Sequence, residues 1–299
     1  MNKGILNGLA AYTLWGFFPI YWKLLQNVPA LQVIGHRIAW SFVLLIAVIL
    51  LTRQWQNFYS VVQSPKTLAL YSIAAVLLSV NWLIYVWGVN AGFIVETSLG
   101  YFINPLISVL LGVIFLRERL RVMQWVPVAL AAAGVLYLTL AYGRLPAIAL
   151  SLAFSFGIYG LVKKLAPLGS LYGLTLETAL VFPLALFYLA FVDFRGTGSF
   201  LHEGALTDLL LIGTGAVTSI PLLMFASAAR QIPLTMIGVL QYIAPTIQFL
   251  IGVFLYHEPF DRSRLIGFGL VWIALIVFWV ENYLARRVPV PPIPELGEG

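Results

Sequence analysis

Long apolar stretches, separated by short polar or charged segments, follow one another along almost the whole chain. Ten such stretches lie at about residues 4–25, 31–52, 67–88, 93–116, 121–142, 145–163, 171–192, 207–229, 233–256 and 263–284. A helix needs about 20 apolar residues to cross the hydrocarbon of a bilayer, and a backbone in lipid must satisfy its own hydrogen bonds. The pattern therefore predicts an all-α polytopic membrane protein with ten transmembrane helices.

Two segments of the chain carry nearly the same residues. The fourth and ninth stretches, with the residues that follow them, share positions 140 residues apart, which pair Pro105 with Pro245, Gly112 with Gly252 and Glu118 with Glu258. Each half holds five predicted helices, and because five is odd the two copies enter the membrane from opposite sides. We therefore predict two inverted five-helix repeats, at residues 1–142 and 143–287, and a Pro-rich disordered tail at residues 288–299. Inverted repeats are typical of secondary transporters, which bind solute near the bilayer midplane.

The charge pattern predicts an orientation in the membrane. Apolar residues make up 61% of the chain and charged residues 9%, whereas soluble domains carry roughly 25% charged residues. With a cytoplasmic N-terminus, the inside segments contain eleven Lys and Arg residues and the outside segments five. The positive-inside rule then predicts that both termini are cytoplasmic. We expect a multi-pass protein of the cell (inner) membrane, in which the net charge of +6 anchors the topology.

The sequence offers little for catalysis. The chain has no cysteine and no phosphate-binding loop of the G-x-x-x-x-G-K-[ST] type, and its three histidines lie far apart, at positions 36, 202 and 257. We therefore predict that the protein is not an enzyme and has no cofactor or metal site. The expected partners are a small-molecule solute and membrane lipid, with no nucleic acid. The sequence does not decide whether the chain forms a homodimer.

Two ionisable residues lie inside predicted spans, where insertion of a charge costs roughly 2.5–3.5 kcal/mol. Arg37 and Glu177 occupy equivalent repeat positions, since 37 + 140 = 177, and a slip of one residue would pair His36 with Glu177 instead. Inversion puts Arg37 and Glu177 at depths about 12 Å apart, so we expect no direct ion pair. Arg37 either extends to the outer interface or contacts solute or a gate. Glu177 and His36 are the candidates for proton coupling.

A polar stripe follows one face of the fourth predicted helix. Its members recur at i, i+4, i+7 and i+11 and are Thr97, Tyr101, Asn104 and Ser108. The ninth helix keeps half of this stripe, as Gln241 and Gln248, and Asn81 is a weaker candidate in the third helix. We expect the solute-binding side chains to include Arg37, Asn81, Tyr101, Asn104, Gln241 and Tyr242.

Pro105 and Pro245 follow Tyr101 and Gln241 by four residues. Because proline has no N–H, each deprives the carbonyl four residues earlier of its helical donor. Such carbonyls, beside a phenol and an amide, are suited to a polar solute. The alternative is that the prolines only kink these helices and that the polar side chains hold neighbouring helices together.

Three carboxylates are expected at the ends of these two helices. Glu96 begins the fourth span, where a carboxylate suits the positive end of the helix dipole, so that a capping role is at least as well supported as ligand binding. Glu118 and Glu258 end the fourth and ninth spans at the water boundary. Glu118 lies between two arginines, which favours a local ion network.

These residues resemble the RarD family of the drug/metabolite transporter superfamily, whose domain is called EamA-type. The resemblance covers nearly the whole chain and includes Trp15-Gly16, His36-Arg37, Trp40-Ser41, Asn81-Trp82, Trp87 to Asn90, Glu96 to Leu106, Met123-Gln124-Trp125, Glu177-Thr178, Pro221-Leu222-Leu223, Gln241-Tyr242-Ile243 and Pro245-Thr246. Family members often carry Glu where this chain has Gln32. The resemblance implies ten helices in two inverted repeats around a central cavity, lined by the first four helices of each repeat, with helices five and ten peripheral.

The prediction for function is a secondary transporter that moves a small organic metabolite or drug-like solute outward by alternating access. An uncoupled facilitator or uptake carrier with the same fold is one alternative. A non-transporting membrane sensor or scaffold is an alternative from another class, although the short predicted loops offer little surface for a soluble partner.

Overall fold

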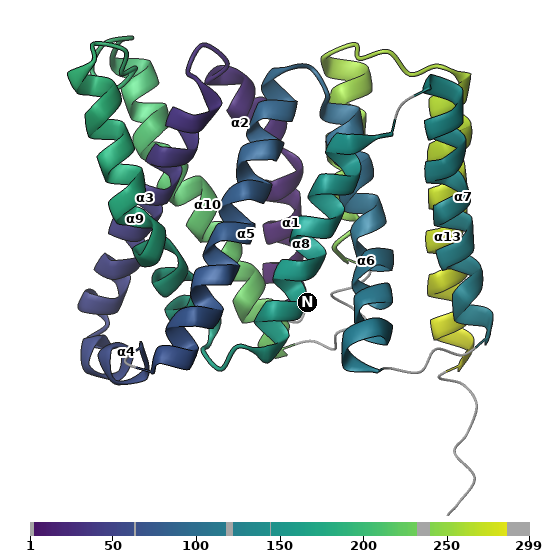
Figure 1. Cartoon of the computed structure of the whole chain (residues 1–299), viewed down its shortest axis with the longest axis horizontal. Helices are drawn as coiled ribbons and strands as arrows, with labels where there is room; N and C mark the ends of the chain where they lie inside the picture. Colours follow the sequence, from purple (N-terminus) through teal and green to yellow (C-terminus); the bar gives the residue numbers. More distant parts are fainter. Residues whose placement is uncertain (1–2, 63, 118–121, 144, 232–239, 286–299) are drawn as a thin grey trace, which may run out of the picture. The chain divides into compact units, whose positions relative to one another are not determined.

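The computed structural model describes residues 3–62, 64–117, 122–143, 145–231 and 240–285. All regular elements in these ranges are helical (Figure 1). They are α1 (Lys3–Gly16), α2 (Phe18–Leu24), α3 (Ala30–Leu51), α4 (Trp55–Val62), α5 (Pro65–Asn90), α6 (Ile94–Leu116), the 3-10 helix η1 (Val122–Gln124), α7 (Trp125–Tyr142), α8 (Ala147–Leu165), α9 (Ser170–Phe194), α10 (Ala205–Gln231), α12 (Ile243–Leu250), the π-helix η2 (Ile251–Leu255) and α13 (Arg262–Ala285).

Length and apolar composition qualify several of these helices to cross a bilayer. Four are long and apolar enough, over Ala30–Leu51, Pro65–Asn90, Leu171–Phe194 and Ala205–Phe225. Shorter apolar helices cover Trp125–Ala141, Ala147–Lys163 and Ile243–Leu255. An all-helical membrane protein is therefore confirmed, while the count of ten spans stays a prediction. The predicted tail and the first part of the ninth span, residues 232–239, lie outside the described residues.

The first predicted span is not one continuous helix. It is broken at Phe17, between α1 and α2. Pro19 explains the break, because its missing N–H leaves the carbonyl of Trp15 without an intrahelical donor. The side-chain amide of Gln248 donates to that carbonyl over 3.0 Å. The prediction of an unbroken helix over residues 4–25 was wrong, since Gln248 stabilises the interrupted form.

The two proline-containing copies also differ. α6 continues through Pro105, whereas a turn at Gln241 and Tyr242 precedes α12. Pro245 is the third residue of α12, where no intrahelical N–H bond is needed. The prediction of an unbroken ninth helix, made from the repeat, was therefore wrong at this turn. The sequence analysis also missed α4, a short helix between α3 and α5, in which Phe58 packs edge-on against Tyr172 at 5.7 Å.

The described helices divide into two compact units. Unit 2 consists of residues 118–145 and 261–299, and its helices α7 and α13 pack on one another. Gly134 permits this approach, because a Cβ there would lie 2.9 Å from the carbonyl oxygen of Gly267. Gly267 in turn faces Leu138. Gly134 also faces Leu270, whereas Leu138, one turn later in α7, faces Gly267. Residue numbers therefore rise along α7 as they fall along α13, so the two helices are antiparallel.

Unit 1 consists of residues 1–117 and 146–260 and contains the remaining helices. Its main helix pairs are α6 with α8, α1 with α10, α10 with α3, α3 with α9, α5 with α8, α5 with α9, α1 with α12 and α12 with α6. α10 and α3 approach closely, since a Cβ on Gly215 would lie 2.5 Å from the carbonyl carbon of Trp40. This supports the interpretation that the small residues of α10 permit close helix packing.

Helices at equivalent repeat positions run antiparallel within unit 1. At one end of the α3–α9 pair, Gln32 contacts the segment after α9. At the other end, the Tyr172 hydroxyl donates to Gln54 over 2.8 Å. Likewise the residues after η2 meet the start of α6, because Glu258 binds the backbone of Ile94. Helices related by the 140-residue offset therefore have opposite directions in these two pairs.

Candidate functional site

The guanidinium of Arg37 lies inside unit 1 and does not reach solvent. Arg37 is 3% exposed. Its guanidinium carbon lies over three aromatic rings, at 4.0 Å from the centroid of Trp82, 5.0 Å from Trp22 and 5.8 Å from Phe18. Extension of this side chain to the outer interface, one of the two alternatives for Arg37, was therefore wrong. The rings hold the cation through their negative faces.

Two phenols complete the surroundings of this cation. Tyr85 and Tyr101 lie near Arg37, and their rings meet edge-on at 5.5 Å. Several buried polar atoms here have no hydrogen-bond partner among the described residues: Nε and Nη1 of Arg37, Nε1 of Trp22 and the hydroxyl of Tyr85. Buried donors without partners are costly and need an explanation.

Asn81 joins the two halves of the chain beside Tyr101. Its amide donates to the carbonyl of Leu152 over 3.1 Å and to the hydroxyl of Ser155 over 2.9 Å, both on α8. Its side-chain oxygen accepts from the Tyr101 hydroxyl over 3.4 Å. The structure thus brings Arg37, Asn81 and Tyr101 into one cluster, as the sequence predicted for solute-binding residues. The bonds to α8 also support the helix-contact interpretation of Asn81.

The other predicted solute contacts are less closely connected. Asn104 lies opposite Gly157, and its buried side-chain oxygen has no hydrogen-bond partner. Gln241 and Tyr242 form the turn before α12. α12 packs on α6, which carries Tyr101. Contact of Gln241 with the Tyr101 cluster stays a prediction.

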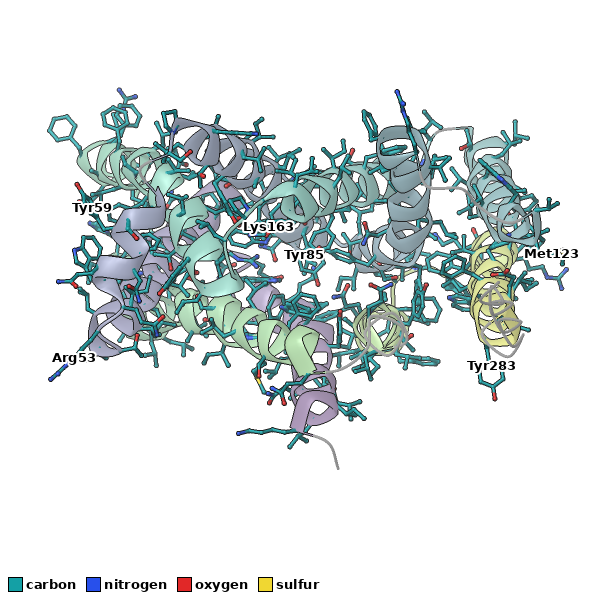
Figure 2. All side chains as sticks on the ribbon, turned by 90° about the horizontal axis from the view of Figure 1, so that it is seen from below. Arg53, Tyr59, Tyr85, Met123, Lys163 and Tyr283 are labelled. Carbon is teal, nitrogen blue, oxygen red and sulfur yellow. The ribbon has the colours of Figure 1, made fainter. Side chains whose placement is uncertain are left out.

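Glu177 lies in a buried ion pair. Its carboxylate is 2.7 Å from Nζ of Lys163 and accepts a hydrogen bond from Tyr159 over 3.2 Å. The ammonium of Lys163 also lies 4.8 Å from the ring of Tyr71. In the view from below, Lys163 and Tyr85 lie within unit 1 and Arg53 at its outer edge (Figure 2). The expectation that Glu177 and Arg37 do not pair directly agrees with this arrangement, because Glu177 pairs with Lys163.

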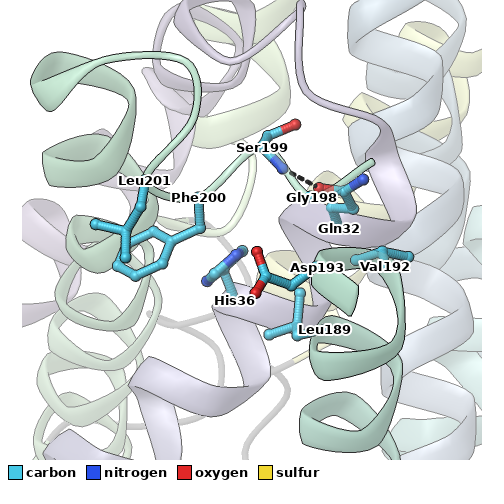
Figure 3. A pocket seen from close by; sticks show the side chains of 9 residues that line it. All are labelled: Gln32, His36, Leu189, Val192, Asp193, Gly198, Ser199, Phe200 and Leu201. Carbon is cyan, nitrogen blue, oxygen red and sulfur yellow. Dashed lines mark hydrogen bonds between the residues drawn. The ribbon is translucent and has the colours of Figure 1, made fainter. Parts of the chain in front are cut away.

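His36 belongs to a different place, at the end where α3 begins and α9 ends. It lines a small pocket with Asp193 and Phe200 (Figure 3), and its ring lies 5.0 Å from that of Phe200. Gln32 closes one side of the pocket, because its amide donates to the carbonyl of Thr197 over 2.8 Å and its oxygen accepts from the Ser199 N–H over 2.9 Å. An amide can make both bonds, whereas the Glu that family members often carry can only accept when ionised.

Two carboxylates cap helices other than their own. The oxygens of Glu258 accept from the N–H groups of Ile94 and Val95 over 2.7 and 2.8 Å, at the N-terminus of α6. Glu96 accepts from the N–H of Ile148 over 3.1 Å, at the N-terminus of α8. Glu96 was expected to cap the start of its own helix; the structure instead shows it at the start of α8. Glu118 lies outside the described residues.

The sequence analysis missed several residues of these clusters. Lys163 was interpreted only as a topology anchor, and Tyr85 and Trp22 were not singled out. A signal for Lys163 exists in the sequence, because Ser155, Tyr159 and Lys163 recur at i, i+4 and i+8 on one face of α8. No comparable periodicity marks Trp22. Its position depends on the break between α1 and α2, which the sequence analysis did not predict.

Apolar helices around a buried cation and a buried ion pair define a polytopic membrane protein of the transporter class. The sequence profile of the "EamA-like transporter family" matches residues 2–140. "Uncharacterized transporter YojE" of Bacillus subtilis (strain 168) is 48% identical over 291 residues, 96% of each chain. "Protein RarD" of Streptomyces exfoliatus is 45% identical over 287 residues, 96% of this chain and 91% of that one. The chain belongs to the RarD family of EamA-type permeases.

A solved crystal structure shares the fold. It is 18% identical to this chain, with a TM-score of 0.58, and the match covers 95% of this chain and 99% of the other. At that identity the likeness concerns the fold alone. The matching profile and the name of the Bacillus relative both describe transporters.

Proposed function

We propose that the protein is a secondary transporter that moves a small organic solute outward by alternating access. The observation that carries this proposal is the buried Arg37 cluster, which joins a cation, three aromatic rings and unpartnered donors inside a bundle of apolar helices. Polar groups of this kind inside a membrane domain are rare and costly unless they bind solute or ions. Arg37, Asn81, Tyr101 and Asn104 form the proposed solute site, to which Gln241 and Tyr242 contribute from the second half.

The proposed architecture is ten helices in two inverted repeats, residues 1–142 and 143–287. The antiparallel course of α3 and α9 supports it, as does the meeting of Glu258 with the start of α6. The packing pattern supports it as well. In the proposed repeats, α1 corresponds to α8, α3 to α9, α5 to α10 and α6 to α12. Replacing both helices of a pair by their counterparts turns α6–α8 into α12–α1, α5–α8 into α10–α1, and α3–α10 into α9–α5. All six of these pairs are in contact. Both termini are proposed to be cytoplasmic, in the cell membrane.

The two ends of the α3–α9 pair supply candidates for gates. At one end Gln32 holds the segment after α9, and at the other Lys163 pairs with Glu177. Alternating access requires that contacts at one end break while those at the other form. We assign proton coupling to Glu177, whose protonation would break the ion pair with Lys163. His36 is the second candidate.

Solute flux into proteoliposomes tests the proposal. The purified full chain is reconstituted and screened with amino acids, nucleosides and phenicols, with and without a pH gradient. Saturable flux that depends on the gradient supports a coupled transporter. Saturable flux without gradient dependence favours the facilitator. Absence of flux of every solute tested, from protein that is folded, contradicts transport and favours the sensor or scaffold.

A further inference from the structure

Within the part of the chain that the structure describes, no carboxylate neutralises the positive charge of Arg37. Tyr85 and Tyr101 lie near its guanidinium but carry no charge as phenols, and none of the carboxylates in the described residues pairs with it. Of the two buried acids among the described residues, Glu177 is paired with Lys163 and Glu258 accepts from the backbone at the start of α6. A buried charge without a counter-ion is strongly unfavourable. The site therefore lacks one negative charge.

The unpartnered atoms around this cation are hydrogen-bond donors. Nε and Nη1 of Arg37 and Nε1 of Trp22 can only donate, and the Tyr85 hydroxyl can donate as well. All four atoms are buried. Arginine presents its donors as a planar fork that matches the two oxygens of a carboxylate. A ligand with two acceptor oxygens on one carbon would satisfy both the charge and the donors.

The rings around the guanidinium indicate what the rest of such a ligand is. Phe18, Trp22 and Trp82 surround the cation, and the rings of Tyr101 and Phe156 meet edge-on at 6.2 Å on the side of α8. These surfaces are apolar or aromatic. They favour an organic body over a bare inorganic anion, whose hydration they could not replace.

We propose that the solute is a carboxylate with an apolar or aromatic body, and that its carboxylate binds Arg37 together with Trp22 and Tyr85. The inference rests on the proposed transport function and names the class of solute for that same site. The donors are closed off from solvent in this structure, so the solute reaches them when the bundle opens. A carboxylate that remains bound would neutralise Arg37 as the bundle closes again, and so would favour the closed arrangement.

Equilibrium binding tests the proposal without requiring transport. The full chain in lipid nanodiscs is titrated by calorimetry with butanoate, benzoate and 3-phenylpropanoate, each beside its own primary amide, and with inorganic phosphate. We expect 3-phenylpropanoate to bind at least about tenfold more tightly than 3-phenylpropanamide. Arg37→Gln should weaken carboxylate binding roughly 10- to 150-fold, as expected for charge-assisted hydrogen bonds, and leave the amide unchanged. Arg37→Lys should fall between, because it keeps the charge and loses the planar fork.

Arg195→Gln is the matched control. Arg195 is exposed and also lies over an aromatic ring, that of Phe191 at 5.9 Å, so its variant should bind every probe as the parent does. If Arg37→Gln does not fold, Tyr85→Phe removes one donor with little change in volume. That variant should weaken carboxylate binding about 2- to 13-fold.

Several results would overturn the inference: equal binding of each acid and its amide, no binding of any carboxylate, tighter binding of phosphate than of the carboxylates, or unchanged selectivity in the Arg37 and Tyr85 variants. Flux separates this failure from failure of the proposed function. If a neutral solute is transported and Arg37→Gln does not change its flux, the proposal that the solute is a carboxylate is refuted, while the proposed transport function stands. Arg37-dependent carboxylate binding without flux supports the site and refutes transport.

Discussion

Lys163 and Glu177 form an ion pair of 2.7 Å between α8 and α9, in which the carboxylate is 1% exposed and the ammonium side chain 24%. Tyr159 donates to the second carboxylate oxygen, and Tyr71 lies beneath the ammonium. The pair links two helices of the second half at the end of the bundle opposite to Gln32. Breaking it would expose a charge on each helix, so a change in its protonation state would be coupled to the packing of α8 on α9.

The first prediction concerns this pair. Glu177→Gln should abolish flux driven by a pH gradient and leave solute exchange largely intact, because the amide keeps the shape of the carboxylate but cannot take up a proton. Counterflow and gradient-driven uptake are measured in the same proteoliposomes. Glu203→Gln, at an exposed site in the segment before α10, is the matched control. Gradient-driven transport that persists in Glu177→Gln would make Glu177 a structural residue.

The second prediction concerns the solute site. Tyr101→Phe removes the hydroxyl that donates a hydrogen bond to the side-chain oxygen of Asn81. Gln241→Leu replaces an amide with an apolar group of similar volume. A hydrogen bond is worth about 0.5–1.5 kcal/mol net, so each change should weaken solute binding roughly 2- to 13-fold without reducing expression. Leu136→Ala, on α7 with an exposed side chain, should leave affinity unchanged. Parental affinity in both Tyr101→Phe and Gln241→Leu would mean that these residues only hold helices together.

The third prediction concerns topology. The loop at Arg117–Arg121 should be cytoplasmic and the loop at His257–Arg264 external, although the two segments are related in sequence. The chain has no cysteine, so single cysteines at Arg117 and Asp261 can be labelled with a membrane-impermeant maleimide on intact cells. Only the second should react. Labelling of both positions from the same side would exclude inverted repeats.

The fourth prediction concerns the cap on α6. Glu258→Gln keeps one acceptor oxygen but removes the charge that faces the positive end of the α6 dipole. The loss should destabilise the protein by about 1 kcal/mol, within the 0.5–2 kcal/mol range of helix caps. Thermal unfolding in detergent measures the change, with Glu203→Gln again as the control. An unchanged melting temperature would mean that the two bonds from Ile94 and Val95 contribute nothing net.

Much of the fold could be predicted because lipid permits few solutions. Apolar runs long enough to span a bilayer must be helical, and apart from the short α4 the helices of the described residues lie within or close to the apolar stretches of the sequence. The breaks at Phe17 and before α12 could not be predicted in the same way. A proline marks where a carbonyl loses its donor, but whether the helix continues depends on a distant partner, as Gln248 is for Trp15.

For the site, the sequence identified the costly groups and the tertiary structure chose their partners. Arg37 and Glu177 stood out because a charge inside an apolar span is unfavourable wherever the helix packs. Two features depend on contacts between different helices: Glu177 pairs with Lys163, and Arg37 faces Trp22 and Trp82 with no carboxylate of the described ranges beside it. The sequence by itself determined that the protein is helical, lies in the membrane and carries buried charges. Only the packing of the helices decided that Glu177 is paired with Lys163 and that Arg37 lies among aromatic rings.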